Sequence, residues 1–209
     1  MTRAAAPLLV LASRSPARMK LLGAAGLDFE AIGAGVDERA VETPLLARGA
    51  GPGEVALHLA EAKALAVSAR MPGRLVLGAD QTLGLGAEVL VKAETRAEAC
   101  RQLGRLQGRT HELHAAVAAA EAGVVVWRHV SVARLTMRPL DPAAVDDYLD
   151  AAGEGILGSV GCYHLEGLGI RLFEAIEGDY FTVLGLPMLP LLGWLRGRGL
   201  IDAPGESFA

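Results

Sequence analysis

Residues 9–22 read LVLASRSPARMKLL, and this stretch decides how the fold begins. A short apolar run gives way to a polar turn, and the turn leads directly into a helix. Ser15 suits the N-cap of this helix, and Pro16 suits its first position. Free backbone N–H groups and the positive end of the helix dipole then lie beside Ser13 and Arg18, where they favour a bound phosphate. An ordinary capped helix with arginines on its solvent-exposed face would show the same pattern.

The rest of the chain alternates strand and helix patterns that glycine and proline interrupt. The expected strands cover residues 8–12, 29–34, 75–79, 89–91, 110–120 and 124–137, of which the last two form a long hairpin. The expected helices cover residues 16–25, 54–69, 95–106, 141–152 and 187–198. The glycine-rich segment 155–169 predicts a shaped loop with short strands.

This alternation predicts an α/β (mixed α+β) fold, with helices packed on a mixed sheet. Hydrophobic residues make up 52% of the chain and aromatic residues only 4%, which indicates a core of alanine, leucine and valine. No repeat, low-complexity tract or linker divides the sequence. We therefore expect one domain over residues 1–209, with a loose tail at 200–209.

Charge and hydropathy exclude several classes of partner. The net charge of −4 argues against a nucleic-acid polymer, because binding one requires a broad basic face. No apolar run approaches the roughly 18–20 residues that span a bilayer, and the start of the chain lacks a signal-peptide pattern. We expect a cytoplasmic protein with no membrane partner. Cys100 and Cys162 are too few for a disulfide framework, and we expect both in the core.

The lysines are unusually rare. Only three of the 20 basic residues are lysines, namely Lys20, Lys63 and Lys92. Because lysine is a compact charge on a mobile stem and arginine is a wide planar fork, a crowded polyphosphate site can require lysine. The alternative is that the three lysines are solvated surface residues retained by chance, above all Lys20.

Asp80 is the best candidate for a catalytic group. The apolar run 75–79 predicts a buried strand that ends at Asp80 and Gln81, and polar groups at such an end often face a cleft. A surround of low polarity would raise the basicity of the carboxylate, so that it could deprotonate a water molecule. An aspartate that caps the following turn is the alternative.

Other acidic and imidazole groups were considered as metal ligands. Asp37 and Glu38 follow the second strand and either hold magnesium through their oxygens or line a solvated loop. His111 and His114 are three residues apart on an expected strand, so their side chains point to opposite faces and make poor co-ligands. No G-x-x-x-x-G-K-[ST] phosphate loop occurs in the sequence.

Taken together, these segments resemble the Maf family of nucleoside triphosphate pyrophosphatases. The resemblance covers residues 8–199 and rests on six motifs in the family's order: LASRSPAR at 11–18 followed by Leu21 and Leu22, VDE at 36–38, AEAK at 60–63, GADQ at 78–81, Lys92, and LGLP at 184–187. It implies an elongated mixed sheet flanked by helices, of Maf and inosine triphosphatase (ITPase) type, with two lobes around a deep cleft.

The resemblance also implies a reaction and its residues. Members hydrolyse the bond between the α and β phosphates of a nucleoside triphosphate, giving a monophosphate and pyrophosphate, in a house-cleaning role that uses Mg²⁺ or Mn²⁺. By resemblance, Asp80 accepts the proton of the attacking water and Glu38 helps to bind the metal. The residues implied to hold the triphosphate are Ser13, Arg18, Lys63 and Lys92.

Three further positions are implied to set the preference for the base, namely Ala17, Gln81 and Glu166. Gln81 and Glu166 resemble the branch that acts on 7-methyl-GTP, where a carboxylate would favour a cationic purine. Ala17 departs from that branch, which usually carries a large aromatic residue able to stack on the base. The residues that flank Lys92 also depart from the usual glycine and proline.

A nucleotide-sensing regulator of cell division, without turnover, is the alternative function. Asp80 argues against it, because a buried carboxylate beside phosphate ligands repels the nucleotide unless a metal or proton intervenes. For the assembly, a homodimer is the commonest arrangement, and the apolar final helix offers a surface for one.

Overall fold

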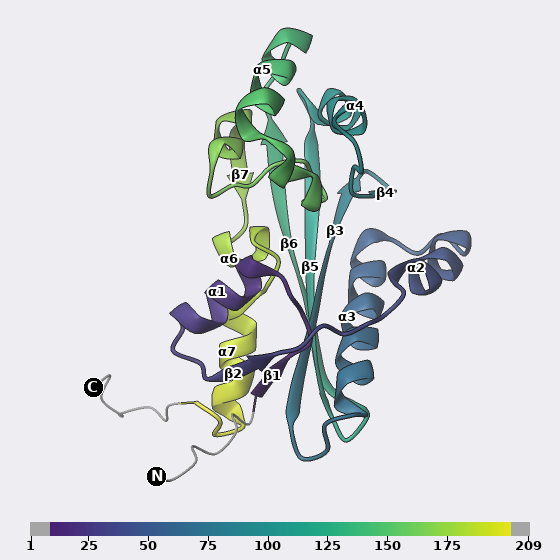
Figure 1. Cartoon of the computed structure of the whole chain (residues 1–209), viewed down its shortest axis with the longest axis vertical. Helices are drawn as coiled ribbons and strands as arrows, with labels where there is room; N and C mark the ends of the chain where they lie inside the picture. Colours follow the sequence, from purple (N-terminus) through teal and green to yellow (C-terminus); the bar gives the residue numbers. More distant parts are fainter. Residues whose placement is uncertain (1–8, 202–209) are drawn as a thin grey trace.

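The computed structural model describes residues 9–201, which form a seven-stranded mixed sheet with helices on both sides (Figure 1). Its strands are β1 (Leu9–Leu11), β2 (Phe29–Ala31), β3 (Leu75–Leu85), β4 (Glu88–Leu90), β5 (Thr110–Glu121), β6 (Val124–Met137) and β7 (Phe173–Glu177). Its α-helices are α1 (Pro16–Ala24), α2 (Glu38–Ala47), α3 (Pro52–Ser68), α4 (Arg96–Leu106), α5 (Pro142–Ala152), α6 (Tyr180–Val183) and α7 (Met188–Gly197), and the 3₁₀ helices are η1 (Glu154–Gly158) and η2 (Leu168–Leu172).

The sheet order is β2-β1-β3-β5-β6-β7, with β4 paired to the far end of β3. β1 pairs in parallel with β2 and β3, whereas the other pairs are antiparallel. The mixed α/β class predicted from the sequence is therefore confirmed.

The opening strand, helix and strand form in the predicted order, but β2 ends at Ala31 and does not reach residue 34 as predicted. The Ser15 side chain accepts a hydrogen bond from the backbone N–H of Arg18, so it caps α1, and Pro16 is the first helical residue. Gly26 follows the helix with a φ of 73°, a conformation that favours glycine. Residue 8 of the first predicted strand and residues 202–209 of the predicted tail lie outside the described residues.

The predicted hairpin is also confirmed, as β5 and β6. Its two turn residues, Ala122 and Gly123, both have positive φ, as tight turns between twisted strands require. These two strands and β3 form the long central part of the sheet (Figure 1).

The predicted end of the third strand was wrong. β3 does not stop at Asp80 but continues to Leu85, because its residues 76–84 pair with β5 along their whole length. On its other edge, β3 pairs with β1 only at residues 75–77 and with β4 only at residues 83–85. Within the described residues 9–201, residues 78–82 therefore have no strand partner on that edge, and Asp80 lies in the middle of this gap.

Helix α3 covers one face of the central strands, with α1 and α7 on the opposite side (Figure 1). Small residues bring α3 close to the sheet: Ala56, Ala60 and Ala64 pack against Ala116, Ala118 and Ala120 of β5. Two larger cores lie on the opposite face of this stretch and at the far end of the sheet, respectively. One contains β1, α1 and α7, and the other contains α4, α5 and the far ends of β3, β5 and β6.

Three elements were missed by the sequence patterns. The residues after Val36 were expected to form a loop, but Asp37 caps α2 by accepting a hydrogen bond from the N–H of Ala40. β7 was missed because its exposed residues show no alternation and its pairing with β6 is distant in sequence. The short helix α6 was not expected either.

The glycine-rich segment 155–169 contains turns and parts of two 3₁₀ helices in place of the predicted short strands. Cys162 is buried as expected, but it lies in a turn with a φ of 56° and not in a strand. Cys100 is only partly buried.

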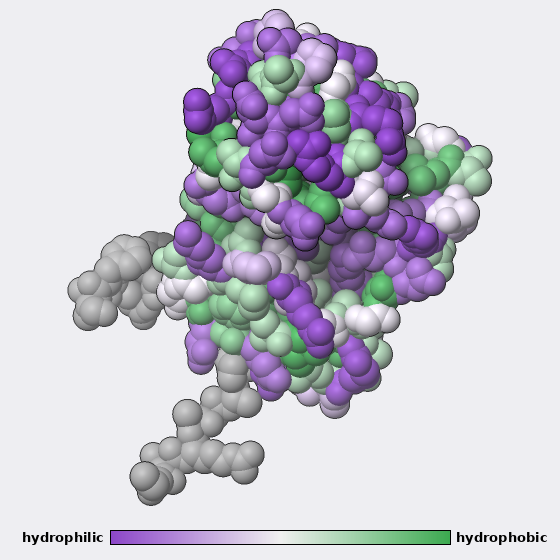
Figure 2. Space-filling view, turned by 45° about the horizontal axis from the view of Figure 1, so that its top comes forward, coloured by the Kyte–Doolittle hydropathy of each residue, from purple (hydrophilic) through white to green (hydrophobic). Residues whose placement is uncertain are grey.

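The surface that carries α4 and α5 is mainly hydrophilic (Figure 2). At this end, Arg96 of α4 forms ion pairs with Asp146 and Asp150 of α5. Within residues 9–201, none of the helices combines the length and the apolar character that crossing a membrane requires.

Candidate active site

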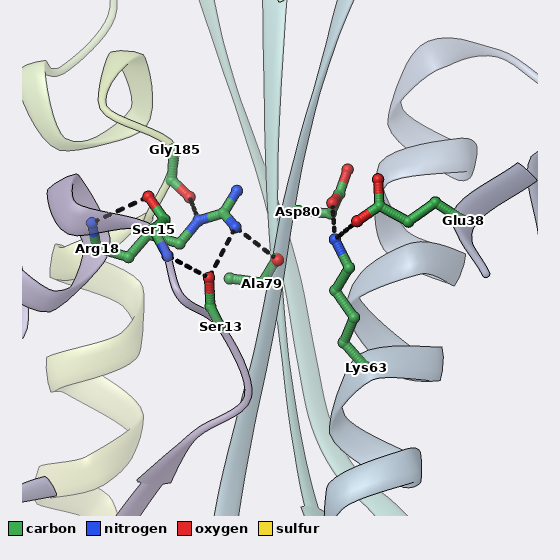
Figure 3. Close-up of polar contacts among 8 residues, drawn as sticks. All are labelled: Ser13, Ser15, Arg18, Glu38, Lys63, Ala79, Asp80 and Gly185. Carbon is green, nitrogen blue, oxygen red and sulfur yellow. Dashed lines mark hydrogen bonds and ion pairs between the residues drawn. The ribbon is translucent and has the colours of Figure 1, made fainter. Parts of the chain in front are cut away.

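The candidate site surrounds the stretch of β3 that lacks a strand partner on one edge. Neighbouring strand residues point to opposite faces, so Asp80 faces α3 and Gln81 faces α6. The Asp80 side chain is buried, with 8% of the residue exposed. Charged groups approach this stretch from both sides, with Arg18 on one side and Lys63 and Glu38 on the other (Figure 3).

Lys63 of α3 bridges two carboxylates. Its Nζ lies 2.5 Å from Oδ1 of Asp80 and 2.6 Å from Oε1 of Glu38 (Figure 3). Lys63 is only 9% exposed, so it is a buried cation whose charge these carboxylates balance. The structure thus brings together three of the residues that the sequence singled out.

Glu38 is the first residue of α2, and its side chain remains partly exposed beside Lys63. Burial raises the pKa of this carboxyl. The hydrogen bond and charge of Lys63, together with the charges of Lys92 and Arg18, outweigh burial and hold the pKa below its ordinary value. Glu38 is therefore an ionised oxygen donor at neutral pH.

Glu42 is a site residue that the sequence reasoning missed. It lies one helical turn after Glu38 on α2, and it is partly buried. Burial raises its pKa, and the negative charges of Asp80 and Glu38 raise it further. Recognising α2 would have exposed the i, i+4 spacing of the two glutamates.

Arg18 is held on the other side of β3. Its Nε donates to the carbonyl of Gly185 at 2.9 Å, and its Nη1 donates to the carbonyl of Ala79 at 2.9 Å and to Oγ of Ser13 at 3.4 Å (Figure 3). Burial lowers the pKa of this guanidinium, while the charges of Asp80 and Glu38 oppose that shift. Arg18 thus ties α1 to the edge of β3, and no hydrogen bond from its Nη2 is found within residues 9–201.

Ser13 lies in the turn between β1 and α1, and only 8% of it is exposed. Its Oγ accepts from the backbone N–H of Ser15 at 3.2 Å as well as from Arg18. The turn before α1 is therefore organised around Ser13, as expected for a loop that receives an anion.

The residues expected to set base preference are more widely spread. Gln81 donates from Nε2 to the carbonyls of Thr182 and Val183, at 2.9 and 3.0 Å, and its Oε1 accepts no hydrogen bond from residues 9–201. Ala17 is partly buried in the first turn of α1. Glu166 is exposed between η1 and η2, and none of the hydrogen bonds or ion pairs found within residues 9–201 joins it to the other site residues.

Lys92 is exposed just after β4, and its charge reaches the site through space. It lowers the pKa of Glu38 and opposes the rise at Glu42. Lys20, in contrast, is exposed on α1. Of the three lysines, only Lys63 is buried.

The two carboxylates that share Lys63 suit a hard divalent cation. Oxygen donors are the ligands that Mg²⁺ prefers, and it usually completes its shell with water and substrate phosphates. Among residues 9–201, no three His, Cys, Asp or Glu side chains are grouped as a complete protein-only metal site. Glu38 and Asp80 therefore fit a cation shared with a phosphorylated ligand.

The two histidines that were rejected as co-ligands do lie on opposite faces of β5. His111 is 1% exposed, and its Nε2 lies 2.7 Å from the hydroxyl of Tyr163. His114 lies against Gly53 at the start of α3, and its Nε2 lies 3.1 Å from Oε2 of Glu112. The prediction that they do not share a metal agrees with this geometry.

Comparison with known proteins decides the family. The profile of the family described as Maf-like protein matches residues 8–198, which includes every element of the site. The chain belongs to the Maf family. This confirms the family resemblance inferred from the six sequence motifs.

Several relatives share more than half of their residues with this Maf protein. A 7-methyl-GTP pyrophosphatase of Rhizobium meliloti is 55% identical over 197 residues, covering 94% of this chain and 99% of the relative. A 7-methyl-GTP pyrophosphatase of Brucella abortus is 52% identical over 194 residues, covering 93% and 98%. A nucleoside triphosphate pyrophosphatase of Rhodopseudomonas palustris is 54% identical over 196 residues, covering 92% and 95%.

Proposed function

We propose that this Maf protein is a nucleoside triphosphate pyrophosphatase, which converts a triphosphate into a nucleoside monophosphate and pyrophosphate. The relatives are named for this activity over nearly their full length. The observation that carries the proposal is the buried Asp80 carboxylate, with cationic groups on both sides of the strand that bears it. A sensor without turnover would not need such a carboxylate.

In this proposal, Asp80 accepts the proton of the water that attacks phosphorus. Its low exposure limits hydration, and Lys63 fixes its position through the contact at 2.5 Å.

The cationic residues bind the triphosphate. Arg18 presents Nη2 from one side of β3, while Lys63 and Lys92 approach from the side of α2 and α3. Ser13 and the first turn of α1 add neutral donors next to Arg18. These groups would offset the negative charge that grows on the leaving pyrophosphate.

We assign Mg²⁺ or Mn²⁺ to the side of the site where Glu38 and Asp80 meet. A cation bound there would neutralise phosphate charge and polarise the phosphorus–oxygen bonds. Glu38 is the main protein ligand, because it is ionised and partly exposed to an arriving cation.

For the substrate, we propose a preference for 7-methyl-GTP with acceptance of other triphosphates. Relatives above 50% identity are named for this nucleotide, and Gln81, on the α6 side of β3, has an Oε1 that accepts no hydrogen bond from residues 9–201. Glu166 would supply negative charge toward the cationic base. Ala17 offers no aromatic face, which limits the preference.

We also propose a two-lobed architecture and a homodimer. One core reaches Ala79 of β3 and a separate core begins at Leu83, which supports two lobes with a substrate cleft between them. A homodimer through α7 is supported by Leu189, which is 62% exposed.

The test is to identify the products formed from 7-methyl-GTP, GTP, UTP and dTTP, with Mg²⁺, with Mn²⁺ and with chelator. Monophosphate and pyrophosphate in equal amounts, formed only with a divalent cation, are expected. Release of diphosphate and orthophosphate would contradict the proposal, as would tight nucleotide binding without any product.

A further inference from the structure

We propose that Lys63 is an internal stand-in for the divalent cation: in the free protein its ammonium occupies the place between Glu38 and Asp80, and the cation displaces it toward the triphosphate. This inference rests on the proposed function, since it concerns the same site. It assigns Lys63 two successive positions, first on the carboxylates and then on the phosphates.

The first argument is geometric. Nζ of Lys63 lies 2.5 Å from Oδ1 of Asp80 and 2.6 Å from Oε1 of Glu38, so the ammonium lies between these two carboxylate oxygens. A divalent cation bound to the same oxygens at about 2.0–2.6 Å would need the same space. The ammonium and the cation therefore cannot occupy this position together.

The second argument is that the side chain of Lys63 can move whereas helix α3 is held in place. Helix α3 is packed on the sheet through its buried alanines, and its Ala60 closely approaches Gly78 of β3. Withdrawal of the backbone at Lys63 would break this packing, so we infer that the displacement is a rotation of the side chain. Lysine has a flexible four-carbon stem that allows this movement.

The third argument is the balance of charge. Electrostatic interactions link three carboxylates of the site with three cations. The carboxylates are Glu38, Glu42 and Asp80, and the cations are Arg18, Lys63 and Lys92. Three negative and three positive charges offset one another in the free protein. A dication alone adds uncompensated positive charge, and a triphosphate alone adds negative charge beside Asp80. When both bind, the cation offsets part of the charge of the triphosphate, so each ligand favours the other.

Acylation footprinting tests the displacement in the unmodified protein, because the chain offers only three lysines to resolve by mass spectrometry. Without nucleotide, saturating Mn²⁺ should raise the rate of Lys63 acetylation several-fold. Lys20, exposed on α1, serves as the internal control and should keep its rate. An unchanged Lys63 rate at saturating Mn²⁺ would overturn the proposal.

A pair of variants tests the competition itself. Lys63→Gln removes the competing charge, so it should bind Mn²⁺ at least tenfold more tightly than the parent in calorimetry without nucleotide, whereas Lys20→Gln should match the parent. Circular dichroism establishes that each variant is folded. Equal or weaker Mn²⁺ binding by folded Lys63→Gln would refute the stand-in role. Neither measurement depends on turnover, so a failed pyrophosphatase assay is a separate result.

Discussion

A Cβ atom on Gly78 of β3 would lie 2.1 Å from the carbonyl oxygen of Ala60 on α3, which is far inside van der Waals contact. The helix therefore rests directly on the backbone of the strand. This close approach places Lys63, less than one helical turn beyond Ala60, beside Asp80. The position of the proposed catalytic carboxylate and its ammonium partner depends on a glycine without a chemical role of its own.

Gly78→Ala should therefore lower both stability and activity. Overpacking of this kind costs about 1–3 kcal/mol in the free energy of unfolding, and separation of α3 from β3 should lower kcat at least several-fold. Gly23→Ala is the matched control, because Gly23 is exposed in α1 with open space around it. That variant should be as stable as the parent or slightly more so. Chemical denaturation measures the free energy of unfolding of both variants. Equal stability of Gly78→Ala and the parent would refute the packing argument.

Lys63→Arg should reduce turnover several-fold although the charge is kept. The wide guanidinium does not fit the buried space that Nζ shares with two carboxylates. Lys20→Arg, on the exposed face of α1, should be nearly silent. Steady-state kinetics on the best substrate compares the two, and equal tolerance would show that the rarity of lysine is a coincidence.

His111 should make stability depend on acid. Burial lowers the pKa of this imidazole to about 4 from 6.5, so the unfolded chain binds the proton first as the pH falls. The contribution of neutral His111 to the free energy of unfolding is complete above pH 6.5. It is lost as the pH falls toward 4, and the loss is about 3 kcal/mol in total.

The measurement is the free energy of unfolding between pH 7 and pH 4 for the parent, His111→Gln and His164→Gln. His111→Gln should show a flatter profile, whereas His164→Gln should follow the parent because His164 is exposed. A parental slope in folded His111→Gln would assign the acid sensitivity to other groups.

Base preference should change in opposite directions at two positions. Ala17→Trp adds an aromatic face worth about 1–3 kcal/mol of stacking, which favours the cationic base of 7-methyl-GTP over a neutral base. Glu166→Gln removes a negative charge and should weaken that preference. The ratios of kcat/KM for 7-methyl-GTP, GTP, UTP and dTTP decide the matter, and identical ratios in both variants and the parent would place base choice elsewhere.

Local signals in the sequence were enough to predict much of the fold. Ser15 with Pro16, and Asp141 with Pro142, mark helix starts through capping that depends only on nearby residues. The turn at residues 122–123 likewise fixes the β5–β6 hairpin. These elements form where the sequence predicts them because the capping and turn signals lie within a few residues of each other.

Elements that depend on distant contacts were not predictable in this way. β3 continues beyond Asp80 because β5 pairs with it, and no residue near Asp80 signals that pairing. Helix α2 contains Pro44 and is held by Leu45, which packs in one cluster with Val55 and Leu59 of α3. The missed helix also explains why Glu42 was overlooked.

In the candidate site too, a contact within one motif was predictable, whereas a contact between motifs was not. Ser13 and Arg18 belong to one local motif, and their contact could be expected from it. The contact of Lys63 with Asp80 joins two motifs that are 17 residues apart, and it follows from α3 resting on β3. Sequence motifs identified both residues, but only the fold gives their common partner, Glu38.

The central claim is that the buried Asp80 carboxylate accepts the proton of the attacking water. Asp80→Asn is nearly isosteric, and Asp147→Asn, at an exposed position on α5, is its control. The direct measurement is kcat for the best triphosphate, together with the Kd of a non-hydrolysable α,β-methylene analogue. We predict that Asp80→Asn stays folded, binds the analogue within a few-fold of the parent and loses roughly 10²-fold or more in kcat, whereas Asp147→Asn keeps the parental rate. Turnover by Asp80→Asn close to the parental rate would contradict the account.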